Sequence, residues 1–298
     1  MTGTARLREA APPTRRDSWR TRLGLLRSLL IYYGVPFKIR RLASLYRPFV
    51  RPGDLCFDIG AHVGDRTRAL RRLGARVVAV EPQPACLDFL RWLYHNDSAV
   101  TLVAMGVGAV EGTATMLVSS ATPTVSSLSS TWVESVRNAP RFSGVVWDGR
   151  ASVRVTTLDA LIERFGAPSL CKLDVEGGEP AALDGLSQAI PTVVFEYIPA
   201  QRAAARACLQ RLERLGSYEY NWTERETARL RLPSWIDAGA MAARLEELPD
   251  GAHSGDIFGR LKKPVAGGQW PVAGDRMGQR DGASHSEMPA GYNCAVLD

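Results

Sequence analysis

The sequence predicts an α/β fold in which a mostly parallel sheet carries helices on both faces. From Asp54 onward, short apolar runs typical of buried strands alternate with longer helical patterns, and this alternation indicates β-α-β crossovers. Hydrophobic residues make up 45% of the 298-residue chain, which suffices for a full core and excludes a disordered protein. The first expected strands and helices are, in turn, 54–59, 64–73, 76–80, 84–95 and 99–104.

An N-terminal extension precedes this alternation and holds the positive charge. Residues 1–51 contain 12 Lys and Arg against Glu9 and Asp17, whereas the rest has 25 basic and 29 acidic residues, a net charge of −4. We expect residues 1–17 to be a disordered basic tail and 18–50 a helical cap on the sheet. A peripheral membrane contact through the basic helices is the alternative. Because the body is acidic, we expect no nucleic-acid partner.

The first expected strand leads into a glycine-rich turn. Leu55 to Ile59 is a short apolar run, followed by Gly60, Gly64 and then a helical segment. Glycine permits a sharp bend and a close approach of the backbone to a ligand. The spacing of these glycines differs from the G-x-G-x-x-G pattern that binds a pyrophosphate. An ordinary crossover with a packing glycine would look the same.

An acidic residue follows the second expected strand. Ala75 to Val80 is apolar, and Glu81 comes next, about 20 residues after the turn. A carboxylate at this position accepts hydrogen bonds from the hydroxyls of a ribose. A glycine turn without pyrophosphate spacing, together with this carboxylate, favours a nucleoside ligand that lacks a diphosphate. S-adenosylmethionine fits that description.

The middle of the chain contains a long stretch without periodicity. Met105 to Gly108 follows the third strand, where a loop containing Gly106 could cover an adenine ring. Residues 120–150 are rich in Ser, Thr and Pro but include Trp132 and Trp147, so we interpret them as a substrate-side lid, with disorder as the alternative. Residues 264–298 are expected to be a disordered tail. Further strands are expected at 113–119, 153–156, 169–174, 191–197, 218–221 and 256–261, and helices at 156–165 and 200–215.

Four carboxylates end expected strands. They are Asp58, Glu81, Asp174 and Glu196, and in a parallel sheet such residues converge on one edge, where ligands bind. Like charges at close range disfavour ionisation, so this gathering suggests a function. Glu176 and Glu179 lie close to Asp174 in the sequence and could instead cap a helix.

At this point the sequence resembles the FkbM-type S-adenosylmethionine-dependent methyltransferases. The resemblance covers roughly residues 54–198 and rests on four motifs: Phe57 to Gly64, Val80 to Pro82, Thr157 to Asp159, and Lys172 to Glu179 with Leu183 and Gly185. It implies a Rossmann-like class I methyltransferase fold with a seven-stranded sheet, spanning residues 51–263. It also implies O-methyl transfer to a hydroxyl of a sugar, glycolipid or secondary metabolite. His62 departs from the family pattern, which often has Asn there.

The resemblance and the motifs together give candidate site residues. For S-adenosylmethionine binding they are Asp58, Gly60, His62, Gly64, Thr67, Glu81, Gly106 and Asp174. The candidate catalytic residues are Asp174, Glu196 and His62, of which Asp174 is placed near the methyl group and Glu196 at the acceptor. No set of metal ligands is evident, and we expect no metal. A non-catalytic module that binds the cofactor is the alternative function.

The remaining expectations concern the compartment and partners. Five cysteines are scattered without a C-x-x-C pair, and residues 23–33 are too short an apolar run to span a bilayer. We therefore expect a cytoplasmic protein whose partner is a small-molecule or glycan acceptor. The sequence leaves the oligomeric state open.

Overall fold

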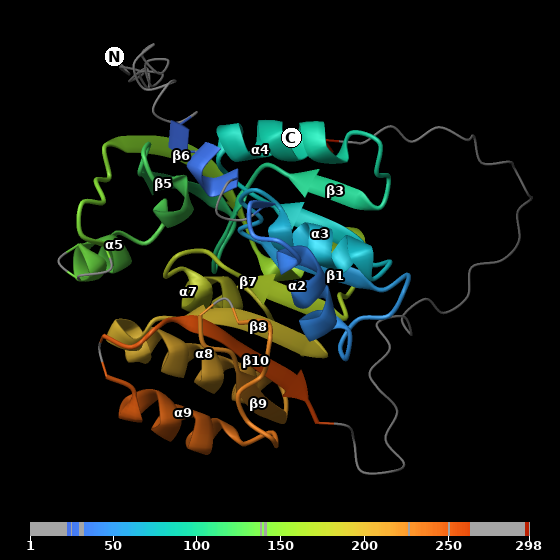
Figure 1. Ribbon diagram of the computed structural model, residues 1–298, viewed down its shortest axis with the longest axis vertical. Coiled ribbons are helices and arrows are strands. Elements are labelled where there is room, and N and C mark those ends of the chain that lie inside the picture. The colour runs from blue at the N-terminus through green and yellow to red at the C-terminus, as the bar shows by residue number, and fades with distance from the viewer. Residues whose placement is uncertain are drawn as a thin grey trace, which may run out of the picture.

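The computed structural model describes residues 23–24, 26–29, 33–137, 139, 142–225, 227–249, 251–262 and 296–297. Its centre is a sheet with the strand order β11-β3-β2-β1-β7-β8-β10-β9 (Figure 1). The strands are β1 (Leu55–Ile59), β2 (Arg76–Val80), β3 (Val100–Val103), β7 (Leu170–Leu173), β8 (Thr192–Tyr197), β9 (Tyr218–Trp222), β10 (Gly255–Leu261) and β11 (Val296–Leu297). Only β10 runs antiparallel to its neighbours in this sheet as described. The prediction of a mostly parallel sheet is therefore confirmed, with β11 added to the seven expected strands.

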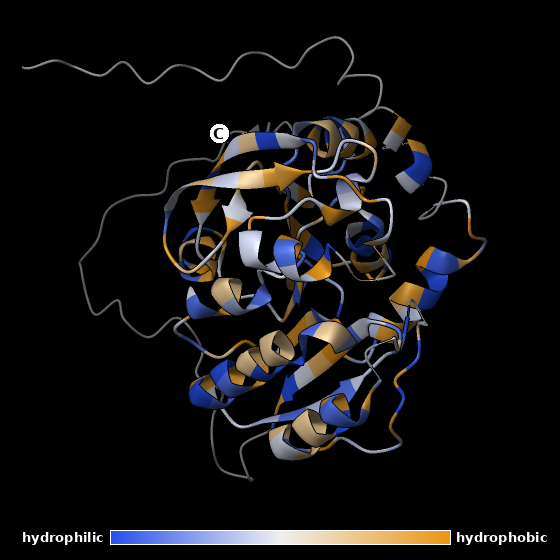
Figure 2. Ribbon diagram, turned by 90° about the vertical axis from the view of Figure 1, so that its left-hand side faces the viewer, coloured by the Kyte–Doolittle hydropathy of each residue, from blue (hydrophilic) through white to orange (hydrophobic). Residues whose placement is uncertain are grey.

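Helices cover both faces of this sheet because alternate strand residues point to opposite sides. Val77 and Ala79 of β2 face one core with α2 (Lys38–Tyr46), α3 (Asp65–Arg72) and α4 (Pro84–Tyr94). Val78 and Val80 face the other core, with α6 (Leu158–Phe165), α7 (Glu179–Asp184), α8 (Arg202–Leu215) and α9 (Ala238–Glu247). Figure 2 shows that the outer helices carry both hydrophilic and hydrophobic residues, as helices between a core and solvent must.

Several helix boundaries follow from local signals in the sequence. The hydroxyl of Thr157 accepts a hydrogen bond from the Ala160 N–H at 3.1 Å and caps α6, as its sequence predicts. Pro84 occupies the first turn of α4, where no N–H is needed. Asp237 caps α9 through the Ala240 N–H, although the sequence analysis placed no helix there.

The expected lid segment is largely structured where it is described. A second sheet of order β4-β6-β5 joins β4 (Gly106–Val107), β5 (Gly112–Val118) and β6 (Gly149–Thr156). Between β5 and β6 lie a 3-10 turn, Pro123–Val125, and α5 (Ser130–Val136). Trp132 packs edge-on against Phe142 and Trp147, with ring centroids 5.5 and 6.3 Å apart. The disorder alternative therefore does not hold for these residues.

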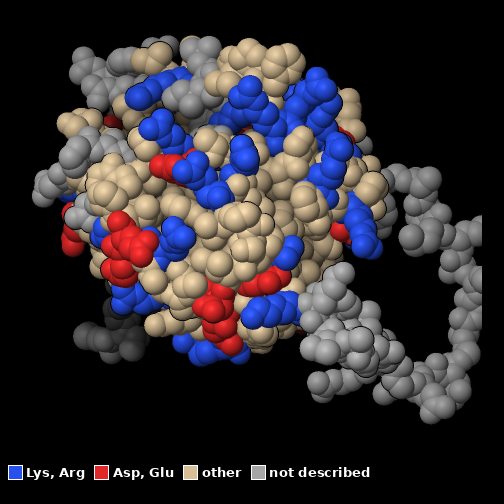
Figure 3. Space-filling model, turned by 60° about the horizontal axis from the view of Figure 1, so that its bottom comes forward, with Lys and Arg blue, Asp and Glu red and all other residues tan. Residues whose placement is uncertain are grey.

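The N-terminal extension adds one defined helix to the sheet. Residues 1–22 and 263–295, and with them the predicted tails, lie outside the described residues apart from β11. Leu42, Ala43, Leu45 and Tyr46 of α2 are buried in the core that α3 also faces, and the cap over residues 18–50 stays a prediction. No helix in the described part of the chain is long and apolar enough to cross a membrane. Figure 3 shows one face of the molecule on which basic and acidic side chains are mixed.

Candidate active site

The first strand turns sharply at Gly60, next to the end of β7. Gly60 has a φ of 80°, and the N–H groups of Gly60 and Ala61 both donate to the Val80 carbonyl, at 2.9 and 3.0 Å. A Cβ atom at Gly60 would lie 1.9 Å from the carbonyl oxygen of Asp174. Only glycine fits this position, because any side chain would force the turns after β1 and β7 apart.

Glu81 directly follows β2, and its side chain lies beside the turn at Gly60. Its two carboxylate oxygens accept hydrogen bonds from the N–H groups of His62 and Gln83, both at 2.8 Å. The residue is 2% exposed, and this burial raises the pKa of Glu81 to about 7, against the effect of those two bonds. A carboxylate has about four acceptor sites, so both oxygens retain capacity for further donors.

Gly60 and Glu81 line one narrow cavity of about 50 Å³. Gly106 of β4 and Met116 of β5 form another wall, and Leu128 of the expected lid segment closes it. The Leu128 side chain approaches so closely that a Cβ atom on Gly106 would lie 2.6 Å from its Cδ1. Ligand pockets usually have several hundred cubic ångströms, so this cavity must widen to admit a nucleoside.

Two other predicted cofactor residues, Asp58 and Thr67, form a hydrogen bond with each other. The Thr67 hydroxyl donates to Asp58 at 2.5 Å, and both side chains are buried. Burial raises the pKa of Asp58 to about 6, while the bond from Thr67 acts in the opposite direction. Asp58 lines a small cavity with Gly60, His62 and Asp174, but Thr67 does not line it. Thr67 therefore orients Asp58, and its part in cofactor binding stays a prediction.

Gly64 is also closely packed against other residues. It has a φ of 78° at the N-terminus of α3, and a Cβ atom there would lie 2.7 Å from Leu90 Cδ2 and 3.3 Å from the Tyr94 ring. Gly64 lines none of the cavities described here. A side chain at this position would collide with α4, because α3 and α4 pack closely, and the cofactor role of Gly64 stays a prediction.

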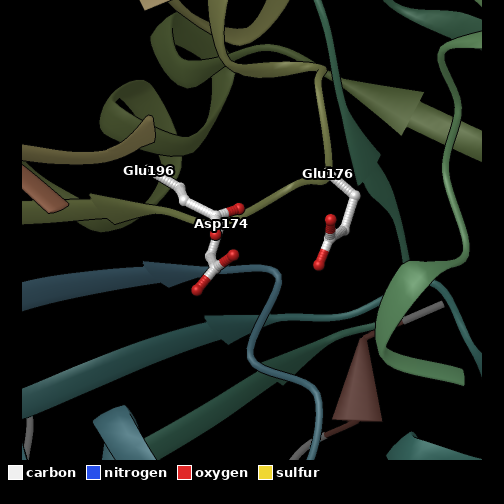
Figure 4. Close-up of side chains that lie close together, drawn as sticks. All are labelled: Asp174, Glu176 and Glu196. Atoms are coloured by element: carbon white, nitrogen blue, oxygen red, sulfur yellow. The ribbon is translucent and has the colours of Figure 1, made fainter. Parts of the chain in front are cut away.

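A larger cavity of about 520 Å³ adjoins the narrow one and shares Thr124, Asp174 and Glu176 with it. Figure 4 shows Asp174 after β7, Glu176 in the following loop and Glu196 on β8, with side chains that approach one another. One carboxylate oxygen from each lies within 4.8 Å of the others. The predicted gathering of strand-end carboxylates thus includes Asp174 and Glu196, while Glu81 lines the neighbouring cavity.

Lys172 lies beneath these carboxylates and is fully buried. Its Nζ atom is 3.3 Å from Asp174, 3.0 Å from Asp256 of β10 and 2.9 Å from the Leu173 carbonyl, to which it donates. Burial disfavours the charged amine, but Asp174 and Asp256 outweigh it and raise the pKa of Lys172. This cation offsets part of the negative charge that the cavity wall gathers.

Glu176 and Glu179, the two possible helix caps, differ in their roles. Glu179 begins α7, and its carboxylate accepts a hydrogen bond from the Val175 N–H at 2.9 Å, so it shapes the loop. Burial raises the pKa of Glu179 to about 7. Glu176 has a φ of 50° and lines both cavities instead. Such left-handed backbone is costly for a residue other than glycine and often marks a functional site.

The motifs of the sequence match a known family model. The model described as the methyltransferase FkbM domain matches residues 58–217, more than half of the chain. The chain belongs to the FkbM methyltransferase family. A comparison with curated protein sequences found no significant match.

Solved structures of methyltransferases resemble this FkbM family member at low identity. An O-methyltransferase from Bacillus cereus, solved in complex with SAH, is 13% identical, with 84% of this chain and 92% of that one covered and a TM-score of 0.40. A TehB-like SAM-dependent methyltransferase from Corynebacterium glutamicum is 13% identical, with 82% and 99% covered and a TM-score of 0.41. The fold is the Rossmann-like class I methyltransferase fold, as the sequence predicts.

The FkbM family implies S-adenosylmethionine as the methyl donor, and the residues at the narrow cavity fit it. Glu81 offers free acceptor sites beside a turn at which a Cβ atom would collide with the backbone. His62 also lines this cavity, and burial lowers the pKa of its imidazole to about 4, so the ring is neutral at pH 7. The three carboxylates of the larger cavity could also hold a divalent cation, since their oxygens lie close enough together.

The N-terminal extension also contacts this FkbM site, which the sequence analysis missed. The Tyr33 hydroxyl donates to the Val63 carbonyl at 2.8 Å, in the turn after β1. Arg27 lines the larger cavity, and a Cβ atom on Gly24 would lie 2.7 Å from the Ser120 carbonyl in the lid segment. No local motif predicts these contacts because they join residues that lie 30 to 96 positions apart.

Arg225 and His253 were missed as well. Both line the larger cavity, Arg225 in the loop after β9 and His253 just before β10. The sequence predicts the two strands, but no local pattern shows that the residues between them lie at the cavity.

Proposed function

We propose that this protein is an S-adenosylmethionine-dependent O-methyltransferase that acts on a hydroxyl of a sugar, glycolipid or secondary metabolite. The observation that carries the proposal is the shared wall of the two cavities. Asp174 and Glu176 line both the narrow cavity beside Glu81 and the larger, polar cavity of about 520 Å³. A methyl donor in the first would present its reactive group to an acceptor in the second, and such alignment lowers the barrier to transfer.

Each residue of the narrow cavity has a proposed part in binding. Glu81 accepts hydrogen bonds from the ribose hydroxyls, and the backbone at Gly60 gives room for the amino-acid end of the cofactor. Gly106 lies on the wall that would cover the adenine. Asp58, braced by Thr67, faces the small cavity beside Gly60. The cofactor itself supplies a methyl group on a positively charged sulfur.

The acceptor hydroxyl needs a group that takes its proton. Asp174, Glu196 and His62 are the candidates, and a well-placed base contributes roughly a hundredfold to ten-thousandfold in rate. Among these three candidates, Asp174 alone lines all three cavities described above. Lys172 holds its carboxylate in place from below. Glu196 lines only the larger cavity, which suits contact with the acceptor.

Calorimetry with S-adenosylhomocysteine tests the cofactor site first. The unmodified protein should bind it, and Glu81→Gln should weaken that binding. Absence of binding by the unmodified protein would refute the proposal.

Turnover then separates an enzyme from a non-catalytic binding module. Glycan and lipid extracts from cells with and without the protein, incubated with labelled methyl donor, should reveal a methylated hydroxyl by mass spectrometry. Asp174→Asn should retain cofactor binding and lose transfer. If binding persists but no extract is ever labelled, the binding-module alternative is supported. A chelator included in parallel reactions shows whether the carboxylate group needs a divalent cation.

A further inference from the structure

The larger cavity is lined by two chemically different groups of residues. Asp174, Glu176 and Glu196 are acidic, and carboxylates accept hydrogen bonds from hydroxyl donors. Arg225 and His253 carry nitrogen donors and line the same cavity from the segments after β9 and before β10. Asp256 lies beside both groups, because it pairs with Glu196 across the β8–β10 ladder and lies three residues after His253.

A buried backbone clamp fixes the position of Arg225. Its N–H donates to the Ser254 carbonyl at 2.7 Å, and the Thr223 N–H donates to the Asp256 carbonyl at 2.8 Å. Thr223 is 1% exposed, and a Cβ atom on Gly255 would lie 2.1 Å from its carbonyl oxygen. The two chain segments are therefore pressed together, and they hold the backbone of Arg225, whose side chain is exposed.

Arg225 also holds an unfavourable backbone conformation. Its φ is 56°, and the described residues other than glycine with positive φ are Phe37, His62, Glu176 and Arg225. Three of these four line the cavities of the site. Strained residues cluster where a side chain must be held in a particular place for function.

The charge of the Arg225 guanidinium is not matched by a carboxylate among the described residues. The neighbouring Glu224 pairs with Arg231 at 3.3 Å, Arg66 pairs with Asp65 at 2.5 Å, and Lys172 pairs with Asp174 and Asp256. The Arg225 Nη2 atom instead donates to His253 Nε2. A guanidinium has only donors in a planar fork, and its best partner is an anionic group with two oxygens.

We propose that Arg225 and His253 form an anion subsite, so that the acceptor is a polyhydroxyl compound carrying a phosphate or carboxylate group. This inference rests on the proposed function of the same cavity. The carboxylates receive the hydroxyls, including the one that is methylated, and Arg225 receives the anionic group. Arg27 adds a second positive charge to the cavity wall.

Titration of the full-length protein, saturated with S-adenosylhomocysteine, tests the subsite. The ligands are inorganic phosphate, glucuronate and glucose, and calorimetry measures the affinity of each. We expect glucuronate to bind at least about tenfold more tightly than glucose, because a charge-assisted pair is lost in the neutral sugar. Phosphate binding points to a phosphorylated acceptor, and glucuronate binding without phosphate binding points to a carboxylated one.

Arg225→Gln should weaken the binding of both anions about tenfold and leave glucose and S-adenosylhomocysteine unaffected. Arg229→Gln is the matched control, since Arg229 is an exposed arginine of the same loop that does not line the cavity. The inference is overturned if neither anion binds more tightly than glucose, or if the Arg225 and Arg229 variants behave alike. Failure of the cofactor itself to bind would refute the proposed function instead, and phosphate titration of the cofactor-free protein would still report on the subsite.

Discussion

The proposed role of Glu81 opposes its burial. Burial favours the neutral acid, whereas the proposed binding of two ribose hydroxyls favours the ionised carboxylate. Two backbone N–H groups orient it without restoring its normal pKa, which remains raised to about 7. The residue is therefore placed for binding at some expense to the stability of the cofactor-free protein.

The first prediction concerns pH. Because the folded-state pKa of Glu81 is raised, its contribution to stability is present below about pH 4.5 and is lost as the pH rises through about 7. The stability of the unmodified protein relative to Glu81→Gln should thus fall by about 3 kcal/mol between pH 4.5 and 8. Urea unfolding of both proteins across this range measures it, and a pH-independent difference would contradict the assigned burial.

Cofactor affinity should follow the opposite trend. S-adenosylhomocysteine should bind more weakly as the pH falls below about 7, because protonated Glu81 loses acceptor capacity. The Glu81→Gln variant should bind about a hundredfold more weakly at pH 8, since two charge-assisted bonds are affected. Calorimetry at pH 6 and pH 8 provides both comparisons.

Backbone strain at Arg225 leads to a prediction about stability. Replacing Arg225 by glycine removes the penalty of its left-handed conformation, which is about 1 kcal/mol or more. At Arg229 φ is not positive, so Arg229→Gly carries the same entropic cost of glycine but removes no backbone penalty. Arg225→Gly should therefore be more stable than Arg229→Gly by about 1 kcal/mol in urea unfolding. Equal stabilities would show that the loop is unstrained.

At the scale of elements, the segment between β5 and α5 covers the narrow cavity. Ser126 and Leu128 line it, and Leu117 and Ser127 pair through their backbones, so the cover is anchored to β5. The Ser127 hydroxyl also donates to the Glu176 carbonyl at 2.7 Å. Opening the cavity requires these contacts to break and reform around a ligand.

Cofactor binding should consequently be limited by this opening. In stopped-flow fluorescence the observed rate should level off at high S-adenosylhomocysteine concentration, and Leu128→Ala should raise the plateau severalfold. Val146→Ala is a suitable control because Val146 is exposed and does not line the cavity. A rate that rises linearly to the diffusion limit in the unmodified protein would exclude such a cover.

Elements with strong periodicity could be predicted from the sequence, and short or irregular ones could not. Strands such as 76–80 and 192–197 combine apolar runs with clear ends, so the predicted bounds agree to within a residue or two. β4 has two residues, and α7 has six that begin with Glu-Pro, too few to show a period. α5 lies among serines and threonines, although Ser129 supplies its cap. The gathering of Asp174 and Glu196 was predictable because the ends of parallel strands converge. The positions of Arg225 and His253 were not, because they depend on the path of the segment between β9 and β10.

At the scale of the whole molecule, Lys172 links two strands of the sheet that are not neighbours. It lies on β7 and forms ion pairs with Asp174 and with Asp256 on β10, although β8 separates these strands. Buried ions in such a group depend on one another, because removal of one leaves the others uncompensated.

Lys172→Met should therefore reduce the free energy of unfolding by about 3–5 kcal/mol. Arg260→Met is the control, since Arg260 pairs with Glu219 at 2.6 Å in a partly exposed position and should cost about 1 kcal/mol or less. Adding Asp256→Asn to Lys172→Met should recover part of the loss. Chemical denaturation measures all three, and similar costs for the two single variants would contradict a buried ionic centre.

The hydrogen bond from Tyr33 to the turn after β1 has a consequence for chimeras between this chain and its relatives. The family match begins at residue 58, yet Tyr33 and Arg27 reach the cofactor turn and the acceptor cavity from 25 or more positions upstream. A chimera spliced at the boundary of the family domain would inherit the glycine bend without the tyrosine that supports it. Grafting experiments should move residues 23–261 as one unit, because the sheet and the cavity extend beyond the family match on both sides.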